Sequence, residues 1–311
     1  MSKALVVIKS RGIGDLCILI SGIHSISRKI GKPVTVLAQK NTQAQSIFKH
    51  DPHIKEVIEL EEKGFFNIIK KIKSKGFDQS YIYSDSFRLY TILKLSGIKE
   101  NFHYKFFSKK CKNFFKTAKE FTEKILHTEI DSQSKIYFDK NDTKEAKRKF
   151  KILDKTKNIV CGISASGPTK RWDIYNYIKL FENLNSKFQC KFFLAGGLND
   201  ENLIKIVMDS SIGKNCVSFS TMTITETIPI ISACQFYIGN DTGWGHISSG
   251  IGLKSLFLFM DSPPAAYGVY SKNISIIVPS GENIESCGHN TRGKDRIPID
   301  KVLHKTLKLI N

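Results

Sequence analysis

Short runs of β-branched and aromatic residues alternate with longer amphipathic segments along the whole chain. This alternation is typical of parallel strands joined by crossover helices, because a parallel pair needs a long connection. In the first half the runs predict strands at residues 4–8, 34–38, 55–60 and 78–83. In the second half they predict strands at residues 158–163, 190–195, 216–219, 235–239 and 255–259.

Each half of the sequence begins anew with a strand, a glycine-containing loop and an amphipathic segment. Residues 139–157, between the halves, are rich in Lys and Asp and have few apolar positions, which is typical of a linker or an exposed helix. We therefore expect an α/β protein with two doubly wound, Rossmann-like domains, residues 1–150 and residues 151–311, that face each other across a cleft.

Two further helices are marked by their ends. Thr223 and Glu226 have the spacing of a capping box, which predicts a helix over residues 224–233. Pro298 precedes apolar residues at helical spacing, which predicts a terminal helix with one buried stripe.

The charge of the chain is +19, from 48 Lys and Arg against 29 Asp and Glu. Residues 1–150 carry 30 of these cations and 16 of these acids, a net +14, which leaves +5 for residues 151–311. At 41% hydrophobic residues the chain can build a large core, so a disordered polycation is excluded. A polyanionic partner is expected to meet the first half, unless an A+T-rich genome has simply enriched the solvated surface in Lys.

The seven cysteines are scattered, without a Cys-x-x-Cys pair, and an odd number cannot all be bridged internally. Most of them lie in apolar runs and are expected to be reduced core residues of a cytoplasmic protein. The apolar run at residues 4–8 is too short for a signal-peptide core. No apolar stretch is long enough to predict a membrane span.

Chemistry is expected first where the strand at residues 4–8 ends. Gly12 and Gly14 let the backbone approach a ligand closely, and Asp15 follows where a helix begins. Asp15 is either a general base aimed into the cleft or the cap of that helix. The segment lacks the third glycine of a dinucleotide-binding fingerprint.

A second loop follows the strand at residues 158–163. Its hydroxyl groups, glycine and adjacent cations are what a diphosphate needs as partners, although an ordinary surface loop has the same composition. The residues concerned are Ser164, Ser166, Gly167, Thr169, Lys170 and Arg171. The spacing of a Walker A loop is absent.

A third segment follows the strand at residues 235–239. Asp241, Thr242 and Gly243 stand where backbone amides at a helix N-terminus can bind an anion. His246 lies about one turn further on, where it can donate to a phosphate or ribose or serve a structural role. Gly196 and Gly197 are expected in a further loop between a strand and a helix. These glycines could serve a ligand site, or they could be there only because a tight turn requires them.

Some patterns of metal and hydrolase sites are absent. The sequence has no Asp-x-Asp pair of the kind that clamps a divalent metal in nucleotide-sugar sites. It also lacks a His/Cys cluster with zinc spacing and a Gly-x-Ser-x-Gly elbow. No metal and no other cofactor is therefore expected.

Three motifs occur in order along the chain: Arg11-Gly-Ile-Gly-Asp15, Pro168-Thr-Lys170-Arg-Trp172 and Gly239-Asn-Asp241-Thr-Gly-Trp-Gly-His246. The set resembles the heptosyltransferases of glycosyltransferase family 9. The resemblance implies a GT-B fold, with the acceptor on the N-terminal domain and the nucleotide-sugar on the C-terminal domain. It also implies a metal-independent, inverting transfer of heptose from an ADP-heptose to a lipopolysaccharide core.

By this resemblance Asp15 matches the catalytic base, and Lys170 matches the cation that offsets charge on the departing diphosphate. The positions that match the nucleotide-sugar site are Ser164, Ser166, Thr169, Asp241, Thr242, Gly243 and His246, with Met222 beside the adenine. The chain departs from the family at Asp173, at Trp244-Gly245 and in the loop at residues 260–264, so the sugar can differ from heptose.

The first half also carries a segment in which cations and aromatic residues interleave, from His103 to Lys119. Its lysines, Lys105, Lys109 and Lys110 among them, are expected to hold the phosphates of an anionic glycolipid acceptor at the membrane surface. Gly14 is also expected to contact the acceptor. The aromatic pairs could equally be core contacts under a solvated Lys face. There are two alternatives to this function. One is the same fold with a different nucleotide-sugar donor, and the other is a basic module that binds nucleic acid or a membrane without catalysis. Nucleic acid is the less expected partner.

Overall fold

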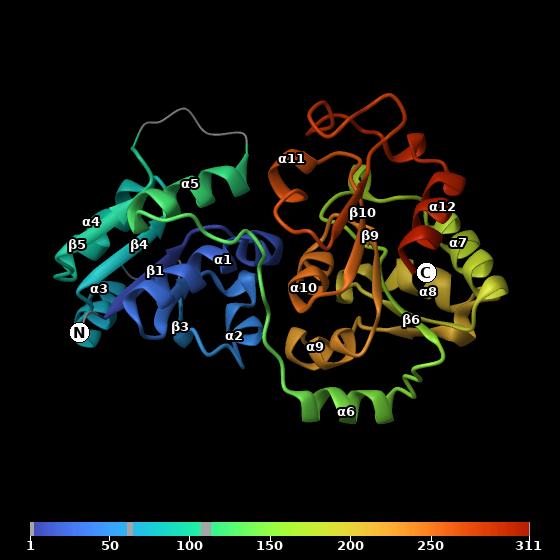
Figure 1. Ribbon diagram of the computed structural model, residues 1–311, viewed down its shortest axis with the longest axis horizontal. Helices are drawn as coiled ribbons and strands as arrows, with labels where there is room; N and C mark the ends of the chain where they lie inside the picture. Colours follow the sequence, from blue (N-terminus) through green and yellow to red (C-terminus); the bar gives the residue numbers. More distant parts are fainter. Residues whose placement is uncertain (1–2, 61–64, 107–112, 311) are drawn as a thin grey trace. The chain divides into compact units, whose positions relative to one another are not determined.

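The structure is a computed structural model that describes residues 3–60, 65–106 and 113–310 of the chain. Contacts divide the chain into two units, Met1–Ser134 and Lys135–Asn311. In Figure 1 the first unit runs from blue to green and the second from green to red.

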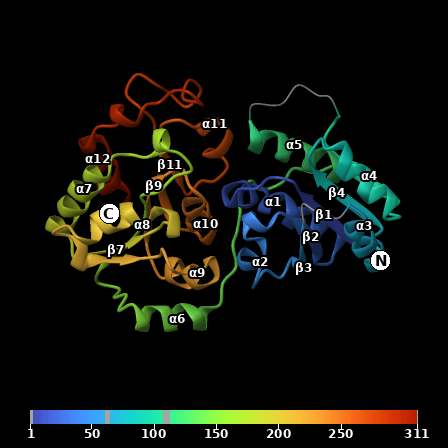
Figure 2. The ribbon, with the colours of Figure 1, turned by 180° about the vertical axis from the view of Figure 1, so that it is seen from behind.

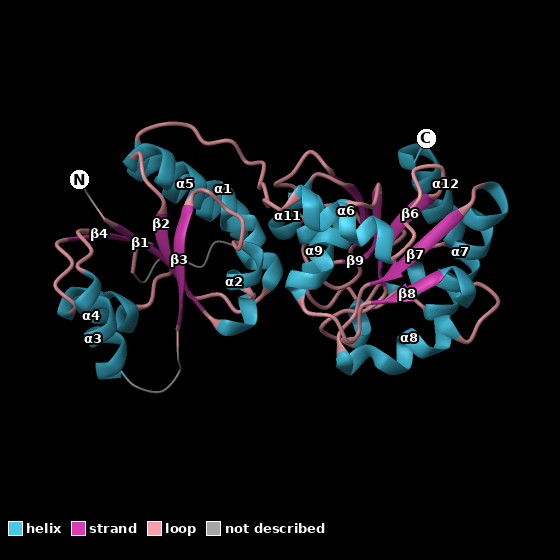
Figure 3. Ribbon diagram, turned by 90° about the horizontal axis from the view of Figure 1, so that it is seen from below, coloured by secondary structure: helices cyan, strands magenta, loops and turns pink. Residues whose placement is uncertain are grey.

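The first unit is built on a parallel five-stranded sheet with the order β3-β2-β1-β4-β5. Its strands are β1 Ala4–Ile8, β2 Val34–Ala38, β3 Ile54–Glu59, β4 Gln79–Tyr83 and β5 Glu100–His103. Its helices are α1 Ile13–Ile30, η1 Lys40–Thr42, α2 Ala44–Ile47, α3 Phe65–Lys75, α4 Phe87–Leu95 and α5 Phe114–Leu126. Figure 3 shows α1 with α5, and α3 with α4, on opposite sides of this sheet.

The second unit is built on a parallel six-stranded sheet with the order β11-β10-β9-β6-β7-β8. Its strands are β6 Lys157–Gly162, β7 Cys190–Leu194, β8 Cys216–Ser218, β9 Phe236–Asn240, β10 Lys254–Leu258 and β11 Ile274–Ile277. Its α-helices are α6 Lys140–Lys149, α7 Ile174–Lys187, α8 Glu201–Met208, α9 Ile224–Ser232, α10 Gly243–Ile251, α11 Pro264–Tyr267 and α12 Ile299–Ile310. Its short 3₁₀ helices are η2 Pro168–Lys170, η3 Leu198–Asp200, η4 Gly213–Asn215 and η5 Lys294–Arg296.

Helices α7, α8 and α12 pack on one face of the second sheet, where their apolar side chains join the strands in one buried cluster. Helices α9 and α10 pack together (Figure 2). Burial of these apolar stripes is the main favourable term that holds the layers together.

The nine predicted strands are confirmed, and each end lies within one residue of its prediction. The capping box is confirmed too: the amide of Glu226 donates to Thr223 Oγ1 at 3.3 Å, and the amide of Thr223 donates to Glu226 Oε2 at 2.7 Å. The predicted terminal helix is α12. The sequence patterns did not predict β5 and β11, which are short edge strands that form because β4 and β10 offer them hydrogen-bonding partners.

The chain divides earlier than residue 150, where the sequence places the domain boundary. Residues 135–150 pack with the second unit: the amide of Ile136 donates to Gly250 O at 2.8 Å, and Thr143 Oγ1 lies 2.7 Å from Ser232 Oγ. The first unit then has 24 Lys and Arg against 13 Asp and Glu, a net +11, and the second has 24 against 16, a net +8. The charge is therefore shared more evenly than the division at residue 150 implies.

A pair of glycines lets the two central strands of the second sheet approach closely. Gly162 of β6 lies opposite Gly239 of β9, and a Cβ on Gly239 would come within 2.5 Å of backbone atoms of Gly162. Backbone cannot move aside as a flexible side chain can, so these positions exclude other residues.

We predict that Gly239→Ala lowers the free energy of unfolding by about 3 kcal/mol, at the upper end of typical overpacking. Gly167→Ala is the matched control, because its backbone is extended and nothing lies within 4 Å of the added Cβ. Its effect should stay within about 0.5 kcal/mol. Urea denaturation of both variants measures this, and equal stabilities would contradict the argument.

Candidate functional site

The carboxyl end of the second sheet is organised by one buried amide, that of Asn240. Its Nδ2 donates to Ile163 O and Ser164 O, both at 3.1 Å. Its Oδ1 accepts from the amide of Trp172 at 3.1 Å and from the hydroxyl of Tyr177 at 3.0 Å. Asn240 is fully buried, so this side chain ties the end of β9 to both ends of the loop after β6.

Half-buried Asp241 and buried His246 form a pair at the start of α10. His246 Nε2 lies 3.1 Å from Asp241 Oδ1, and Nδ1 lies 2.9 Å from the hydroxyl of Tyr270. Ser262 donates to the other carboxylate oxygen of Asp241 at 2.8 Å. A carboxylate only accepts, so Nε2 carries the hydrogen of this pair. Both ring nitrogens of His246 therefore contact protein groups, an arrangement that suits a residue that orients Asp241.

The N-terminus of α10 lies against the sheet because Gly245 has no side chain. A Cβ there would come within 2.6 Å of the Phe257 ring. Thr242 occupies the N-cap position without capping through its side chain, and its hydroxyl lies 3.2 Å from that of Tyr237. The first amides of a helix have no partner within the helix, so Thr242 and Gly243 present donors suited to an anion.

The loop after β6 is tied to neighbouring loops through its polar side chains. Thr169 donates to Asp261 Oδ2 at 2.6 Å. The Arg171 guanidinium donates to Ala165 O at 3.2 and 3.0 Å and lies 3.5 Å from Asp200 Oδ1. Lys170, between them, is half-buried.

Asp261 stays ionised in this setting. Burial by itself would raise the pKa of Asp261, but hydrogen bonds from Thr169 and from the amides of Arg292 and Asn290, with the charge of Lys170, hold that pKa below its usual value. The carboxylate therefore fixes the loop of Thr169 and Lys170 to the loop after β10.

The remaining predicted residues of this unit differ in exposure. Ser166 is exposed, whereas Ser164 is buried and its hydroxyl donates to Ala195 O at 3.5 Å. Met222 is half-buried, and its amide donates to Phe219 O at 2.9 Å. The ring of Phe219 packs 5.7 Å from that of Trp244 in the first turn of α10, which brings the loop of Met222 to the helix N-terminus.

Asp15 lies in the first unit, in the first turn of α1. Gly12 occupies the N-cap position, so the helix begins two residues before Asp15 and the interpretation of Asp15 as its N-cap is wrong. The side chain of Asp15 is half-buried and lies close to Gly12, where an added Cβ would be 3.2 Å from Asp15 Oδ2. Gly14 is half-buried beside it.

The basic segment expected to hold the acceptor is described only in part. Lys109 and Lys110 lie outside the described residues, and Lys105 is exposed. Within α5, Lys116 lies 3.8 Å from Glu120, and Lys119 pairs with Glu123. These acids lower the positive charge of the helix, so the predicted membrane contact gains no support from it.

Within the described residues, no three His, Cys, Asp or Glu side chains gather in a way that could hold a metal ion. Among the same residues no helix has the length and apolar character needed to cross a membrane.

Comparison with known proteins gives the family of the chain. The sequence profile of glycosyltransferase family 9 (heptosyltransferase) matches residues 67–296, which leaves the Asp15 motif outside the match. A lipooligosaccharide heptosyltransferase 2 of Campylobacter jejuni (strain 81116) is 26% identical over 242 residues, 71% of this chain and 72% of that protein. One of Haemophilus influenzae is 27% identical over 121 residues, 38% of this chain and 35% of that protein.

Solved structures resemble this one over its whole length. The E. coli ADP-heptose lps heptosyltransferase II has a TM-score of 0.82 at 17% identity, covering 99% of this chain and 98% of that one. E. coli heptosyltransferase WaaC with ADP has a TM-score of 0.73 at 13% identity, covering 99% and 100%. At such identities the likeness shows the fold. The chain belongs to glycosyltransferase family 9 (heptosyltransferase) and is a glycosyltransferase with the GT-B fold.

Proposed function

We propose that the chain transfers a heptose or a related sugar from an ADP-sugar to a lipopolysaccharide core or a similar glycolipid, without a metal and with inversion. The observation that carries the proposal is the set of anion-binding groups that Asn240 holds at the end of the second sheet. The names of the Campylobacter and Haemophilus relatives support heptosyl transfer. ADP in the structure of WaaC supports the nucleotide.

The diphosphate of the ADP-sugar would bind near the end of β9, between two groups of hydrogen-bond donors, one at the start of α10 and one at η2. The amides of Thr242 and Gly243 at the start of α10 donate to one part of it. Thr169 and Lys170 at η2 supply a hydroxyl and a positive charge, and Ser166 a second hydroxyl. Met222 would line the adenine. Asp241, held by His246 and Ser262, would accept hydrogen bonds from donor hydroxyl groups.

In the reaction the acceptor hydroxyl oxygen attacks the anomeric carbon of the sugar as the bond from that carbon to the diphosphate oxygen breaks. Asp15 takes the proton from the attacking hydroxyl, and attack from the face opposite the diphosphate inverts the anomeric configuration. Negative charge grows on the departing ADP, where Lys170 and the α10 amides stabilise it.

Family membership favours catalysis over a basic binding module without it. A different nucleotide-sugar on the same fold is the remaining alternative, because Trp244 and the loop at residues 260–264 depart from the family pattern. A cytoplasmic location and peripheral contact with the membrane stay predictions of the sequence.

We predict that ADP raises the midpoint of thermal unfolding more than UDP, GDP or CMP does, because ligands that bind only the folded state stabilise it. At a concentration about 100 times the Kd the shift should be about 5 °C. The shift should persist in EDTA if no metal is needed. A larger response to another nucleotide, or loss of the response in EDTA, would contradict the proposed donor or the metal independence.

The same assay tests the diphosphate contact of Lys170. Lys170→Ala should reduce the ADP shift, whereas Lys179→Ala, which removes an exposed cation from α7, should leave it unchanged. An unchanged shift in Lys170→Ala would place the diphosphate elsewhere.

We predict that Asp15→Asn lowers the rate of transfer about 10²–10⁴-fold, because an amide cannot take the proton. The thermal shift with ADP should be unchanged, since the donor groups lie in the second unit. Asp85→Asn is the control, because Asp85 is an exposed acid of the same unit. Full transfer by Asp15→Asn, measured with ADP-heptose and lipopolysaccharide core, would show that another group is the base.

A further inference from the structure

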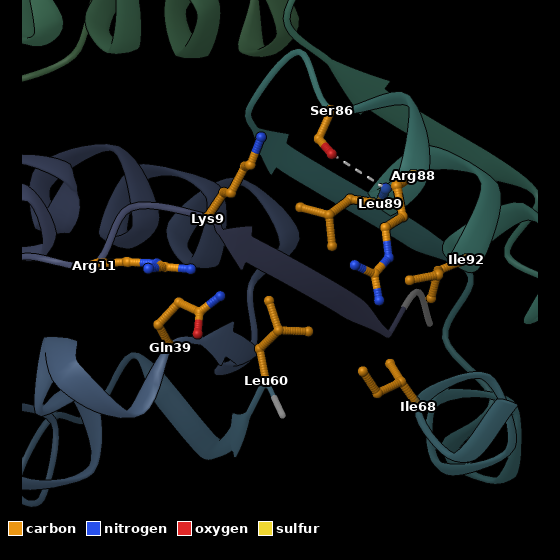
Figure 4. A pocket seen from close by; sticks show the side chains of 9 residues that line it. All are labelled: Lys9, Arg11, Gln39, Leu60, Ile68, Ser86, Arg88, Leu89 and Ile92. Carbon is orange, nitrogen blue, oxygen red and sulfur yellow. Dashed lines mark hydrogen bonds between the residues drawn. The ribbon is translucent and has the colours of Figure 1, made fainter. Parts of the chain in front are cut away.

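Cations stand at the carboxyl ends of both sheets. In the first unit Lys9, Arg11 and Arg88 line a pocket of about 370 Å³, together with apolar side chains of α3 and α4 (Figure 4). In the second unit the long loop between β11 and α12 brings Arg292 to the end of β10, where its amide donates to Asp261 Oδ1 at 2.9 Å. The proposed mechanism does not use the side chain of Arg292.

The segment around Arg292 is anchored to the loop that follows β10. The thiol of buried Cys287 lies 3.7 Å from Ser262 O. The amide of Gly293 donates to Met260 O at 3.0 Å. These contacts hold the backbone of Arg292 beside the loops of the candidate donor site.

The backbone of Arg292 has a conformation that a side chain makes unfavourable. Its φ is 47°, in the left-handed region, and that of Asn290 is 76°. Glycine takes this conformation freely and Asn takes it more readily than most residues, whereas Arg does not. The amides of both residues donate to Asp261, which offsets part of the cost. A use for the side chain would explain why arginine stands at a position that suits glycine.

The side chain of Arg292 is exposed and has no ion-pair partner among the described residues. The neighbouring arginines differ in this respect. Arg171 lies 3.5 Å from Asp200, and Arg296 lies 3.1 Å from Glu282. Of these three guanidinium groups, that of Arg292 is therefore the one left for a ligand.

Asp261 places Arg292 next to the groups proposed to bind the diphosphate. Thr169 donates to Asp261 Oδ2 at 2.6 Å, and the amide of Arg292 donates to Oδ1. One carboxylate thus joins the loop of Thr169 and Lys170 to the loop of Arg292. The hydrogen-bond donors to Asp261 are a hydroxyl and backbone amides, all of them uncharged. The ammonium group of Lys170 and the guanidinium group of Arg292 are not taken up by these hydrogen bonds.

We propose that Arg292 is a second cation of the donor site, and that its guanidinium group binds the phosphate attached to the sugar. Each phosphate of an ADP-sugar carries a negative charge, and the departing ADP gains another, so Lys170 alone leaves part of the charge unmatched. A guanidinium group presents parallel donors to a phosphate, and such charged hydrogen bonds are among the strong ones. The inference rests on the proposed function, which places the diphosphate beside Thr169 and Lys170.

The test compares ADP with AMP by isothermal calorimetry, because only ADP has the phosphate to which the sugar is attached. Arg292→Gly removes the side chain and suits the left-handed backbone, so its midpoint of thermal unfolding without ligand should stay near that of the unchanged protein. Its affinity for ADP should fall about 10-fold or more, because a hydrogen bond to a charged group is lost. Its affinity for AMP should be unchanged.

Two further variants separate the contact from general charge. Arg292→Lys should fall between, because it keeps the charge and loses the fork. Lys294→Ala is the matched control, since Lys294 is an exposed cation of the same loop, and it should bind both nucleotides as the unchanged protein does. An equal loss of ADP affinity in Lys294→Ala would reduce the effect to surface charge and overturn the inference.

The remaining outcomes distinguish this inference from the proposed function. Equal weakening of ADP and AMP in Arg292→Gly would show that Arg292 does not act on the phosphate next to the sugar, and would overturn the inference. ADP binding by Arg292→Gly as tight as that of the unchanged protein would overturn it too, and would leave the donor assignment intact. If the unchanged protein did not bind ADP, both would be overturned.

Discussion

The candidate donor site depends on the need of a buried amide to have its hydrogen bonds satisfied. Asn240 is fully buried, and an amide in that position costs free energy unless its donors and acceptor find partners. It finds them in Ile163 and Ser164 on one side and in Trp172 and Tyr177 on the other. The loop that carries Thr169 and Lys170 is thereby fixed beside the start of α10.

Glycine supplies the second constraint on this site. Gly162 and Gly239 allow β6 and β9 to approach, and Gly245 allows α10 to rest on the sheet. With these side chains absent, the amides at the start of α10 and the loop after β6 lie at the same end of the sheet. Hydrogen bonds then fix the positions of the carboxylates. His246 and Ser262 hold Asp241, and Thr169 holds Asp261.

The first unit has the same kind of parallel sheet but different side chains at the ends of its strands. Its strand ends bring together cations and apolar side chains, rather than the hydroxyls and helix amides of the second unit. The net charges of the units, +11 and +8, differ little, so total charge does not separate their roles. The placement of Arg11 and Arg88 at one pocket is more informative than the Lys excess.

The sequence by itself determined the nine main strands, the capping box of α9 and the glycine-containing loops, because these depend on local periodicity and on residues close in the chain. Only the tertiary structure decided the edge strands β5 and β11, since they form by pairing with a neighbour. It also placed residues 135–150 with the second unit and showed both nitrogens of His246 engaged. The same holds for the pocket of Lys9 and Arg88, because parallel strands bring residues distant in sequence to one edge of the sheet.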